Sequence, residues 1–547
     1  MSARTEATTL TLGELLAERL RRAGVRRAYG FPGGGSNLEL FEAFEHAGIE
    51  AVLAHSEGGA GFMACADAEI HGAPGVLVVG NGPGLSSAVN AVAHAWLDRV
   101  PLVVISDRYT DVEAATTGHQ VLDQRALLGP VVKLGATLEA QGAEAMIDRA
   151  LAAVLAAPRG PVHFDLRRDA ATRRVFPLDE PPPPGASMPQ TPAVDPDALR
   201  TFARELDDAR RPLVLVGLEA NDGTSPADLQ RLVHAAGAAV LTTYKAKGVY
   251  SERDARWAGI LTGAEIERPL LEQADVVLAV GLDAVELLGR PWTYGARVLS
   301  VAACEAADAY LRPAHRVVGS VADAVSGLAA LLGSPSAGFS EAAVAELRQS
   351  AMRRLRLDDD LPLPGWRIVE TVAAELPPNT TISVDAGAHM FPCTNFLHPE
   401  SPRRFLISNG LATMGFAVPA AVGAALARPG ELSVAFTGDG GVAYHGHELE
   451  TARRVGAKVV VVVFNDSSLS LIRIKQEAKG FTRRPLNFGL TRFDLFAAAL
   501  GAHGVVAQDA DELRAAAADA VRRDESTLID VRMTGSEYAR TLEAIRG

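Results

Sequence analysis

The chain is poor in cysteine and in aromatic residues and has no excess of positive charge. Its three cysteines, Cys65, Cys304 and Cys393, lie far apart and form no CxxC pair, which argues against a disulfide framework or a cysteine zinc site. Free thiols suit a reducing compartment, and we expect a cytoplasmic protein. A net charge of −13 argues against a partner with a phosphate backbone, which requires a basic face, so we expect no nucleic-acid partner.

No segment has the unbroken apolar character of a membrane helix. Residues 1–9 contain Glu6 and lack an apolar core, so they do not predict a signal peptide. The stretch from Phe405 to Ala427 carries no charged side chain, but Gly410 and Gly415 interrupt it. We predict a strand, a glycine loop and a buried helix there, and no membrane partner.

What the chain does contain is an alternation of short apolar strands and helices. Apolar residues make up 48% of the 547 positions, enough for a large buried core. In the middle of the chain, helical segments such as Ser225–Ala236 separate four predicted strands, Leu213–Val216, Ala239–Leu241, Val276–Val280 and Val298–Val301. This alternation is typical of a doubly wound parallel sheet, and the predicted fold class is α/β.

Segments rich in proline, glycine and serine divide the chain. A proline-rich connector runs from Phe176 to Pro196. Two further segments of this kind, 333–339 and 357–365, flank a predicted helix at Glu341–Arg356. The three predicted domains span residues 1–175, 190–332 and 365–547.

The most specific motif is Gly438-Asp439-Gly440, which is followed by Asn465-Asp466. Each element comes directly after a predicted buried strand, Leu432–Thr437 for the first and Lys458–Phe464 for the second, with a predicted helix at His447–Val455 between them. The carboxyl ends of parallel strands meet at the edge where open α/β sheets bind ligands, so these side chains should lie close together. Acidic oxygens beside glycines that let a phosphate approach the backbone suit a hard divalent cation that holds a diphosphate.

This spacing is similar to the motif of thiamine diphosphate-dependent enzymes, and the rest of the chain is closest to their acetolactate synthase-like members. Asp466 stands where the family usually has Asn, but an Asp can also bind Mg²⁺. The resemblance covers nearly the whole chain and implies three domains, each built on a doubly wound parallel sheet. The first (1–175) would bind the pyrimidine, the second (190–332) is the central domain, and the third (365–547) would bind the diphosphate. The other matching segments are Ser56-Glu57-Gly58, Gly80–Gly84, His119-Gln120 with Asp123 and Pro130–Lys133, Asp385–His389 and Leu411–Pro419.

The resemblance implies a site for thiamine diphosphate and Mg²⁺. The metal ligands would be the carboxylates of Asp439 and Asp466 and the backbone carbonyl of Ser468. Glu57 would hydrogen-bond the aminopyrimidine and so promote loss of the thiazolium proton, and Met414 would hold the cofactor in a bent shape. The other expected cofactor-binding residues are Gly82, Gly387, Ala388, His389, Gly438, Gly440 and Gly441.

His119 and Gln120 are further expected catalytic residues, on the segment that resembles acetolactate synthases. A histidine suits proton transfer near neutral pH, and a glutamine can donate a hydrogen bond to a substrate carbonyl or carboxylate. The alternative for His119 is a solvated loop histidine without a chemical role.

The implied reaction begins with a 2-oxo acid such as pyruvate, which loses CO₂, and ends with ligation to a second carbonyl compound, as in acetolactate synthases. Four alternatives stay open: a non-ligating 2-oxo acid decarboxylase, a benzaldehyde lyase-like enzyme, a 2-hydroxyacyl-CoA lyase and a non-catalytic binding protein on the same fold. In the family the cofactor lies between subunits, so the resemblance also implies a homodimer or homotetramer.

We predict that the protein binds no FAD, because the segment Leu282–Glu286 lacks the Arg that flavin-binding relatives carry there. The purified protein should be colourless, and it should consume no oxygen when pyruvate is added, because pyruvate oxidation needs an electron acceptor. Visible absorption and release of flavin on heating check this directly. One bound FAD per chain would contradict it.

Overall fold

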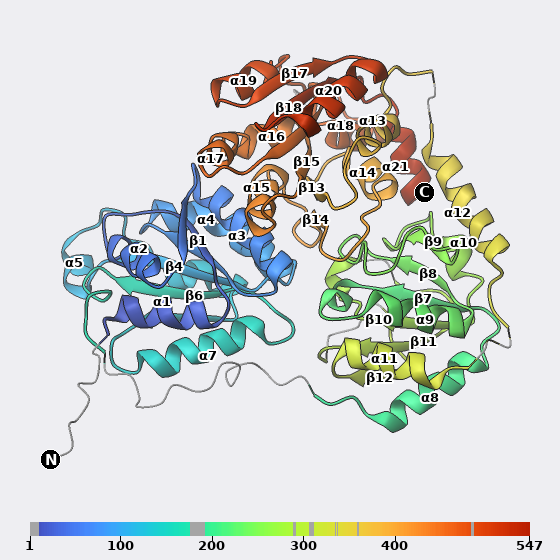
Figure 1. Ribbon diagram of the computed structural model, residues 1–547, viewed down its shortest axis with the longest axis horizontal. Coiled ribbons are helices and arrows are strands. Elements are labelled where there is room, and N and C mark those ends of the chain that lie inside the picture. The colour runs from blue at the N-terminus through green and yellow to red at the C-terminus, as the bar shows by residue number, and fades with distance from the viewer. Residues whose placement is uncertain are drawn as a thin grey trace. The chain divides into compact units, whose positions relative to one another are not determined.

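The computed structural model describes residues 10–175, 192–287, 291–305, 311–333, 335, 337–357, 360–482 and 486–547 (Figure 1). It contains three six-stranded sheets with parallel pairing throughout, and the predicted α/β class with three doubly wound sheets is confirmed. Most of the predicted proline-rich connector, positions 176–191, lies outside the described residues. The chain forms two compact units, residues 1–190 with 422–427 and residues 191–421 with 428–547.

The first unit is built on a sheet with strand order β2-β1-β3-β4-β6-β5. Its first helix is amphipathic and begins at a capping box of Thr11 and Glu14. The strands are β1 (Arg27–Phe31), β2 (Glu50–Leu53), β3 (Gly75–Val79), β4 (Leu102–Arg108), β5 (Leu134–Leu138) and β6 (Val162–Arg167). The helices are α1 (Leu12–Arg22), α2 (Asn37–His46), α3 (Glu57–His71), α4 (Pro83–Leu97), α5 (Asp111–Thr116), α6 (Gln124–Leu128) and α7 (Ala143–Leu155).

The central sheet, in the second unit, has the order β12-β11-β10-β7-β8-β9, the arrangement of dinucleotide-binding sheets. The predicted strand Val276–Val280 is found at those residues as β10. The other strands are β7 (Pro212–Val216), β8 (Ala239–Thr242), β9 (Trp257–Ile260), β11 (Arg297–Ala302) and β12 (His315–Val318). The helices are α8 (Pro196–Asp207), α9 (Pro226–Ala236), α10 (Arg268–Leu271) and α11 (Val321–Leu331).

The third sheet, β14-β13-β15-β16-β18-β17, repeats the strand order of the first. Its strands are β13 (Thr381–Val384), β14 (Phe405–Ile407), β15 (Ser433–Gly438), β16 (Val459–Asn465), β17 (His503–Ala507) and β18 (Thr527–Arg532). Its helices are α12 (Glu341–Leu355), α13 (Gly365–Ala373), α14 (Met390–Phe396), α15 (Ala417–Ala427), α16 (Asp439–His445), α17 (Glu448–Arg454), α18 (Ser470–Ala478), α19 (Phe493–Ala499), α20 (Ala510–Arg522) and α21 (Tyr538–Arg546).

Two local predictions in this third part can be compared with the structure. The uncharged stretch from Phe405 to Ala427 is a short strand, a loop and a buried helix, as predicted. The helix predicted at His447–Val455 is found as α17. A separate helix that was not predicted, α16, precedes it and starts at Asp439. The prediction missed α16 because a Gly-Asp-Gly-Gly run has low helix propensity, which tertiary packing overrides here.

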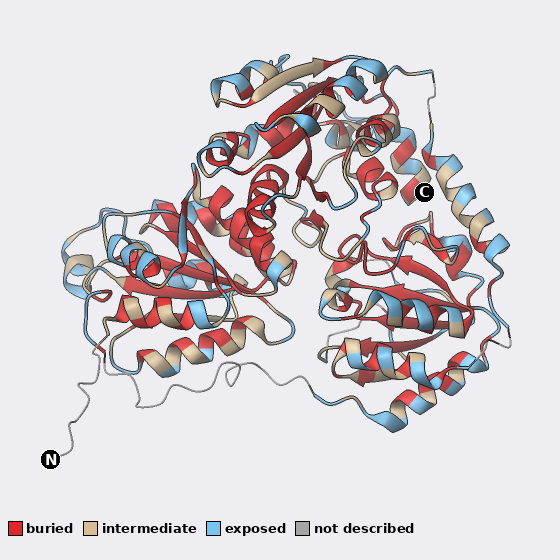
Figure 2. Ribbon diagram, viewed as in Figure 1, coloured by how far each residue is buried: buried red, intermediate tan, exposed pale blue. Residues whose placement is uncertain are grey.

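The core lies on both faces of each sheet, because parallel strands are covered by helices on both sides. Every residue of β16, Val459 to Asn465, is buried. Figure 2 shows the same pattern for most strands, with exposed residues concentrated on the outer sides of the helices and in loops. No described helix combines the length and the apolar character that crossing a membrane requires.

Glu286 fills the carboxyl edge of the central sheet at the point where the strand order reverses, between β7 and β10. Its carboxylate accepts hydrogen bonds from the backbone N–H groups of Leu218 at 2.8 Å and Asp283 at 3.2 Å, and from the hydroxyl of Thr243. A side chain on Gly217 would lie 2.7 Å from the Glu286 carboxylate. The Glu286 carboxyl group therefore accepts hydrogen bonds from backbone N–H groups at the edge where sheets of this strand order bind nucleotides.

The environment of Glu286 predicts a stability change with pH. Burial raises the pKa of Glu286 to about 8, above its value of 4.5 in the unfolded chain. The stability that the protonated group contributes is fully present below pH 4.5 and is lost as pH rises through about 8. The Glu286→Gln variant should therefore lose less stability than wild type between pH 5 and pH 8.5 in urea-unfolding titrations.

The matched control for this experiment is Glu272→Gln, a substitution at an exposed glutamate of the same central part. It should follow the wild-type pH dependence. Parallel pH profiles for wild type and Glu286→Gln would show that Glu286 does not titrate in this range.

Candidate active site

A cavity of about 220 Å³ lies at the carboxyl edge of the third sheet. The loops after β13, β14, β15 and β16 enclose it, because those strand ends meet where the strand order reverses between β13 and β15. All ten cofactor-binding residues predicted in this part of the chain line it, so the structure brings them together. They are Gly387, Ala388, His389, Met414, Gly438, Asp439, Gly440, Gly441, Asp466 and Ser468.

Glycine is required where β15 passes into α16, because neighbouring side chains take the space of a Cβ. A Cβ at Gly441 would lie 2.4 Å from both the Asp385 carboxylate and the Thr437 hydroxyl. A Cβ at Gly440 would lie 2.8 Å from the terminal methyl of Met414. The two glycines therefore let the helix start close to β13 and let the Met414 side chain reach the cavity floor.

Asp439 and Asp466 form a pair of partly buried carboxylates in this cavity. Asp439 accepts hydrogen bonds from the backbone N–H of Gly440 at 2.6 Å and of Ser468 at 3.1 Å, which ties the two motif loops together. Burial and the charge of Asp466 raise the pKa of Asp439 to about 6. Burial also raises the pKa of Asp466, whose carboxylate accepts from the Ser470 hydroxyl. A divalent cation between two such carboxylates would neutralise their repulsion.

Two further polar groups in the cavity lack a hydrogen-bond partner within the described part of the chain. They are Nε2 of His389 and the hydroxyl of Ser468. The His389 ring is stacked on Phe464 with 5.4 Å between ring centres, and burial lowers its pKa to about 4, so it is a neutral ring near pH 7. Unused polar groups, of which the Ser468 hydroxyl is a donor, beside a carboxylate pair fit a bound diphosphate with its Mg²⁺.

Asp385, at the end of β13, orients the loop that carries Met414. Its fully buried carboxylate accepts from the Thr437 hydroxyl at 2.6 Å and from the Ala417 backbone N–H at 2.8 Å. It thereby links the end of β15 to the start of α15. The loop before α15 contains Ala412 and Gly415 at positive φ, 54° and 84°, a conformation that needs such external support.

Sequence analysis placed Asp385 in the matching segment Asp385–His389 without giving the residue a role of its own, and it did not mark Tyr538 near the C-terminus. Tyr538 lines the cavity, and Gly535 just before it lies so close to Asp466 that a Cβ would approach the carboxylate to 2.3 Å. Asp385 carried a weak signal, since it is an acid that directly follows a buried strand. Nothing in the sequence pattern indicated Tyr538.

In the first unit, Glu57 is the first residue of α3, and the Ser56 hydroxyl caps that helix by accepting from the Gly59 N–H at 3.1 Å. A Cβ at Gly84 would lie 3.5 Å from a Glu57 carboxylate oxygen, so the glutamate packs on the glycine loop after β3. Glu57 is half-buried. The structure thus brings two of the segments that resemble the family together within this unit.

Gly82, His119 and Gln120 belong to the same unit. Gly82 has φ of 64°, and a Cβ there would lie 2.6 Å from the Gln120 carbonyl oxygen, so these two residues touch. Gln120 also has a positive φ, 58°. His119 is exposed on the same loop, where its backbone N–H donates to the Thr117 hydroxyl at 3.3 Å.

Gln124 anchors this loop and was missed by sequence reasoning. Its buried amide accepts from the Gly82 N–H at 3.2 Å and donates to the Ser106 hydroxyl, the Asp107 carbonyl and the Asp165 carboxylate at 2.9 to 3.1 Å. Because these hydrogen bonds are made in a buried site, the Gln124 amide fixes the glycine loop relative to the strands β4 and β6.

Three doubly wound sheets, with a carboxylate pair and unused polar groups at the edge of the third, define a cofactor-dependent α/β enzyme. The chain belongs to the thiamine pyrophosphate enzymes. The N-terminal TPP binding domain of that family matches residues 10–127, the central domain matches 199–330, and the C-terminal TPP binding domain matches 385–531.

Relatives of known name support the same family. An acetolactate synthase of Bacillus subtilis (strain 168) is 26% identical over 543 residues, which covers 95% of this chain and 92% of the relative. A probable 2-ketoarginine decarboxylase of Pseudomonas aeruginosa is 29% identical over 547 residues, covering 96% and 94%. The solved structure of a thiamine diphosphate-dependent 4-hydroxybenzoylformate decarboxylase of Rhodococcus jostii RHA1 has the same fold, with a TM-score of 0.82 at 20% identity over 96% of this chain and 99% of that one.

The resemblance seen in the sequence is therefore confirmed, as is the assignment of the chain to thiamine diphosphate-dependent carboligases and decarboxylases. Thiamine diphosphate is supported by the two matching TPP binding domains. The individual roles of the residues in the cavity stay predictions, and so do the domain boundaries at 1–175, 190–332 and 365–547.

Asp466 gives the sharpest test of the cavity. Asp466→Ala should weaken Mg²⁺ and thiamine diphosphate binding together by about 10-fold or more, because the metal and the diphosphate bind as one unit. Asp466→Asn should bind both nearly as well as wild type, because an amide oxygen can still coordinate the metal. Isothermal titration calorimetry measures both affinities.

The control for Asp466 is Asp511→Ala, which removes an acid whose side chain is 94% exposed on α20 of the same sheet. It should leave both affinities unchanged. Wild-type affinity in Asp466→Ala would exclude Asp466 as a metal ligand.

Proposed function

We propose that this chain is a thiamine diphosphate- and Mg²⁺-dependent enzyme that decarboxylates a 2-oxo acid such as pyruvate and joins the remaining acyl unit to a second carbonyl compound. The observation that carries the proposal is the cavity at the third sheet, which is lined by Asp439 and Asp466 and by two polar groups without a partner among the described residues, His389 Nε2 and the Ser468 hydroxyl. Oxygen ligands for Mg²⁺ and donors for phosphate oxygens are the groups that a metal-bound diphosphate requires.

When bound, thiamine diphosphate supplies a thiazolium carbon that can add to a 2-oxo acid and accept the electrons released with CO₂. The residues of the protein position the cofactor and hold a proton. Asp439, Asp466 and the Ser468 carbonyl would hold the metal, and the loop of His389 together with the Ser468 hydroxyl would hold the diphosphate. Met414, held against Gly440, would press on the rings of the cofactor, and Glu57 would hold a proton at the pyrimidine nitrogen.

The remaining expected residues would handle the substrate. Gln120 touches Gly82 and can donate a hydrogen bond to a substrate carbonyl or carboxylate. His119 is exposed and can exchange protons with solvent. By analogy with the family, we propose that the active sites are completed between subunits of a homodimer or homotetramer located in the cytoplasm.

The cavity wall favours ligation over release of an aldehyde. Leu469, Leu471 and Ile472 line it together with Tyr538, so one side of the site is mainly apolar. An apolar wall excludes water and accommodates the carbon chain of an acceptor. A non-ligating decarboxylase is the second candidate, since one relative is a probable 2-ketoarginine decarboxylase.

The product distinguishes the two candidates. Incubation with pyruvate, thiamine diphosphate and Mg²⁺ should release CO₂ and yield acetolactate or another hydroxyketone, detected by mass spectrometry. Acetaldehyde as the main product would favour the decarboxylase. If no member of a panel of 2-oxo acids loses CO₂ with the cofactor present, the proposed function is wrong.

The role of Glu57 can be tested without knowing the substrate. Glu57→Gln should still bind thiamine diphosphate, but exchange of the cofactor's thiazolium proton for deuterium should slow by about 100-fold or more, because the proton-holding carboxyl is gone. NMR of quenched samples measures that exchange. Glu45→Gln, at an exposed position of α2, is the matched control and should exchange at wild-type speed.

If Glu57→Gln exchanged as fast as Glu45→Gln, Glu57 would have no part in activating the cofactor. The calorimetric affinity of the same variant separates this outcome from a simple loss of binding.

A further inference from the structure

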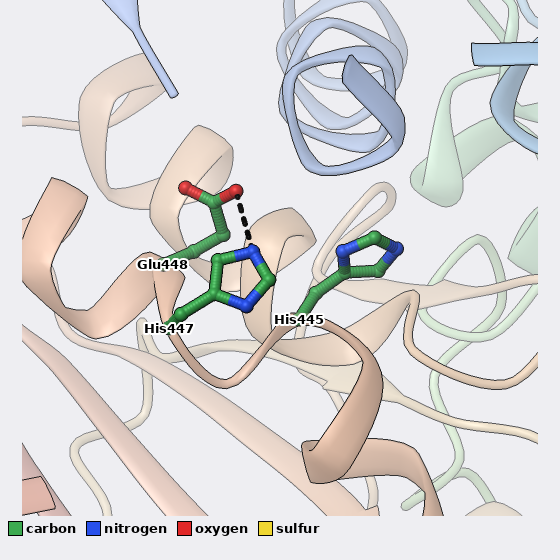
Figure 3. Close-up of side chains that lie close together, drawn as sticks. All are labelled: His445, His447 and Glu448. Atoms are coloured by element: carbon green, nitrogen blue, oxygen red, sulfur yellow. Dashed lines mark ion pairs between the residues drawn. The ribbon is translucent and has the colours of Figure 1, made fainter. Parts of the chain in front are cut away.

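We propose that His445, His447 and Glu448 form a second metal site, for a divalent transition-metal ion such as Zn²⁺. Figure 3 shows the three side chains together between α16 and α17, with the His447 ring drawn between the Glu448 carboxylate and the His445 ring. One ligand atom from each residue lies within 4.8 Å of the other two. Two imidazoles and one carboxylate are a common ligand set for such ions.

The spacing of these atoms is close to that of a bound ion. Ligands about 2.0–2.2 Å from a tetrahedral zinc lie roughly 3.3 Å from one another. Nε2 of His447 lies 3.4 Å from a carboxylate oxygen of Glu448, so this edge of the site already has ligand spacing. The ring centres of His445 and His447 are 5.7 Å apart at an interplanar angle of 73°, and the third ligand atom still lies within 4.8 Å of the other two.

The local fold holds the three ligands in a short segment. His445 ends α16, His447 precedes α17, and Glu448 is its first residue. Gly446 between them makes the tight turn possible, because a Cβ there would lie 2.5 Å from the Val442 carbonyl oxygen. Ligands on two helix ends that meet at a glycine are fixed by the backbone rather than by long flexible side chains.

The carboxylate is prepared for metal binding. Glu448 is fully buried, and the Thr451 hydroxyl donates to one of its oxygens at 2.6 Å, which turns the other oxygen toward His447.

This site is separate from the cavity by position and by chemistry. Asp439 begins α16 and His445 ends it, so the length of a seven-residue helix, roughly 10 Å, lies between them. Carboxylate and carbonyl oxygens favour Mg²⁺, whereas imidazole nitrogens favour zinc, cobalt, nickel or copper. The His445 ring also lies next to the loop that carries Met414, since a Cβ at Gly415 would be 3.0 Å from it.

The test uses Co²⁺ as a spectroscopic probe with the full-length protein. Excess Mg²⁺ is added to occupy the Asp439–Asp466 site, whose ligands are oxygen atoms. Wild type should bind one Co²⁺ per chain, with the visible absorption bands that are typical of an ion with a low coordination number. His445→Gln and His447→Gln should each weaken that binding by about 10-fold or more. His503→Gln, at a half-buried histidine of β17, is the control and should bind like wild type.

The opposing explanation is that His447 and Glu448 form only an ion pair and that any bound Co²⁺ is adventitious. It predicts equal Co²⁺ binding by wild type and both histidine variants, or none by any of them, and either result overturns the site. Circular dichroism checks that each variant is folded, and the two histidines are tested independently. The measurement needs no thiamine diphosphate, so its outcome does not depend on the proposed reaction.

Discussion

The carboxylates of Asp439 and Asp466 lie near one another in a largely buried cavity, and the other features of the site follow from that pair. Burial and mutual repulsion both disfavour two negative charges there, as the raised pKa of Asp439 reflects. A divalent cation removes this conflict, and a diphosphate completes its coordination. The glycines after β15, the Asp385 carboxylate and the unused polar groups of His389 and Ser468 surround this pair at a ligand-binding edge.

The sequence predicted most of the fold because its signals are local. Runs of valine and leucine between turn residues marked the buried strands, and β10 lies at the predicted residues. The ten predicted cavity residues also come together, because each follows the end of a parallel strand and all those ends share one edge. The prediction missed α16, where a glycine-rich helix start depends on packing against β13 and Met414, and it missed the strands β9 and β12 of the central sheet.

The supporting residues could not be predicted, because their partners lie far away in the sequence. Gln124 meets Gly82 and Asp165 only after β4 and β6 have paired, and Asp385 meets Thr437 only after β13 and β15 have paired. Tyr538 reaches the cavity from the last helix. The pair His445 and His447 had no motif to mark it, and its proximity to Glu448 depends on the turn at Gly446.

The central claim is that the Asp439–Asp466 pair binds a dication together with thiamine diphosphate. The most direct test is anomalous diffraction from crystals grown with thiamine diphosphate and Mn²⁺ in place of Mg²⁺. Our account predicts one strong peak bonded to both carboxylates and to the Ser468 carbonyl, with the diphosphate within hydrogen-bond distance of His389. A bound cofactor whose manganese contacts neither carboxylate would contradict it.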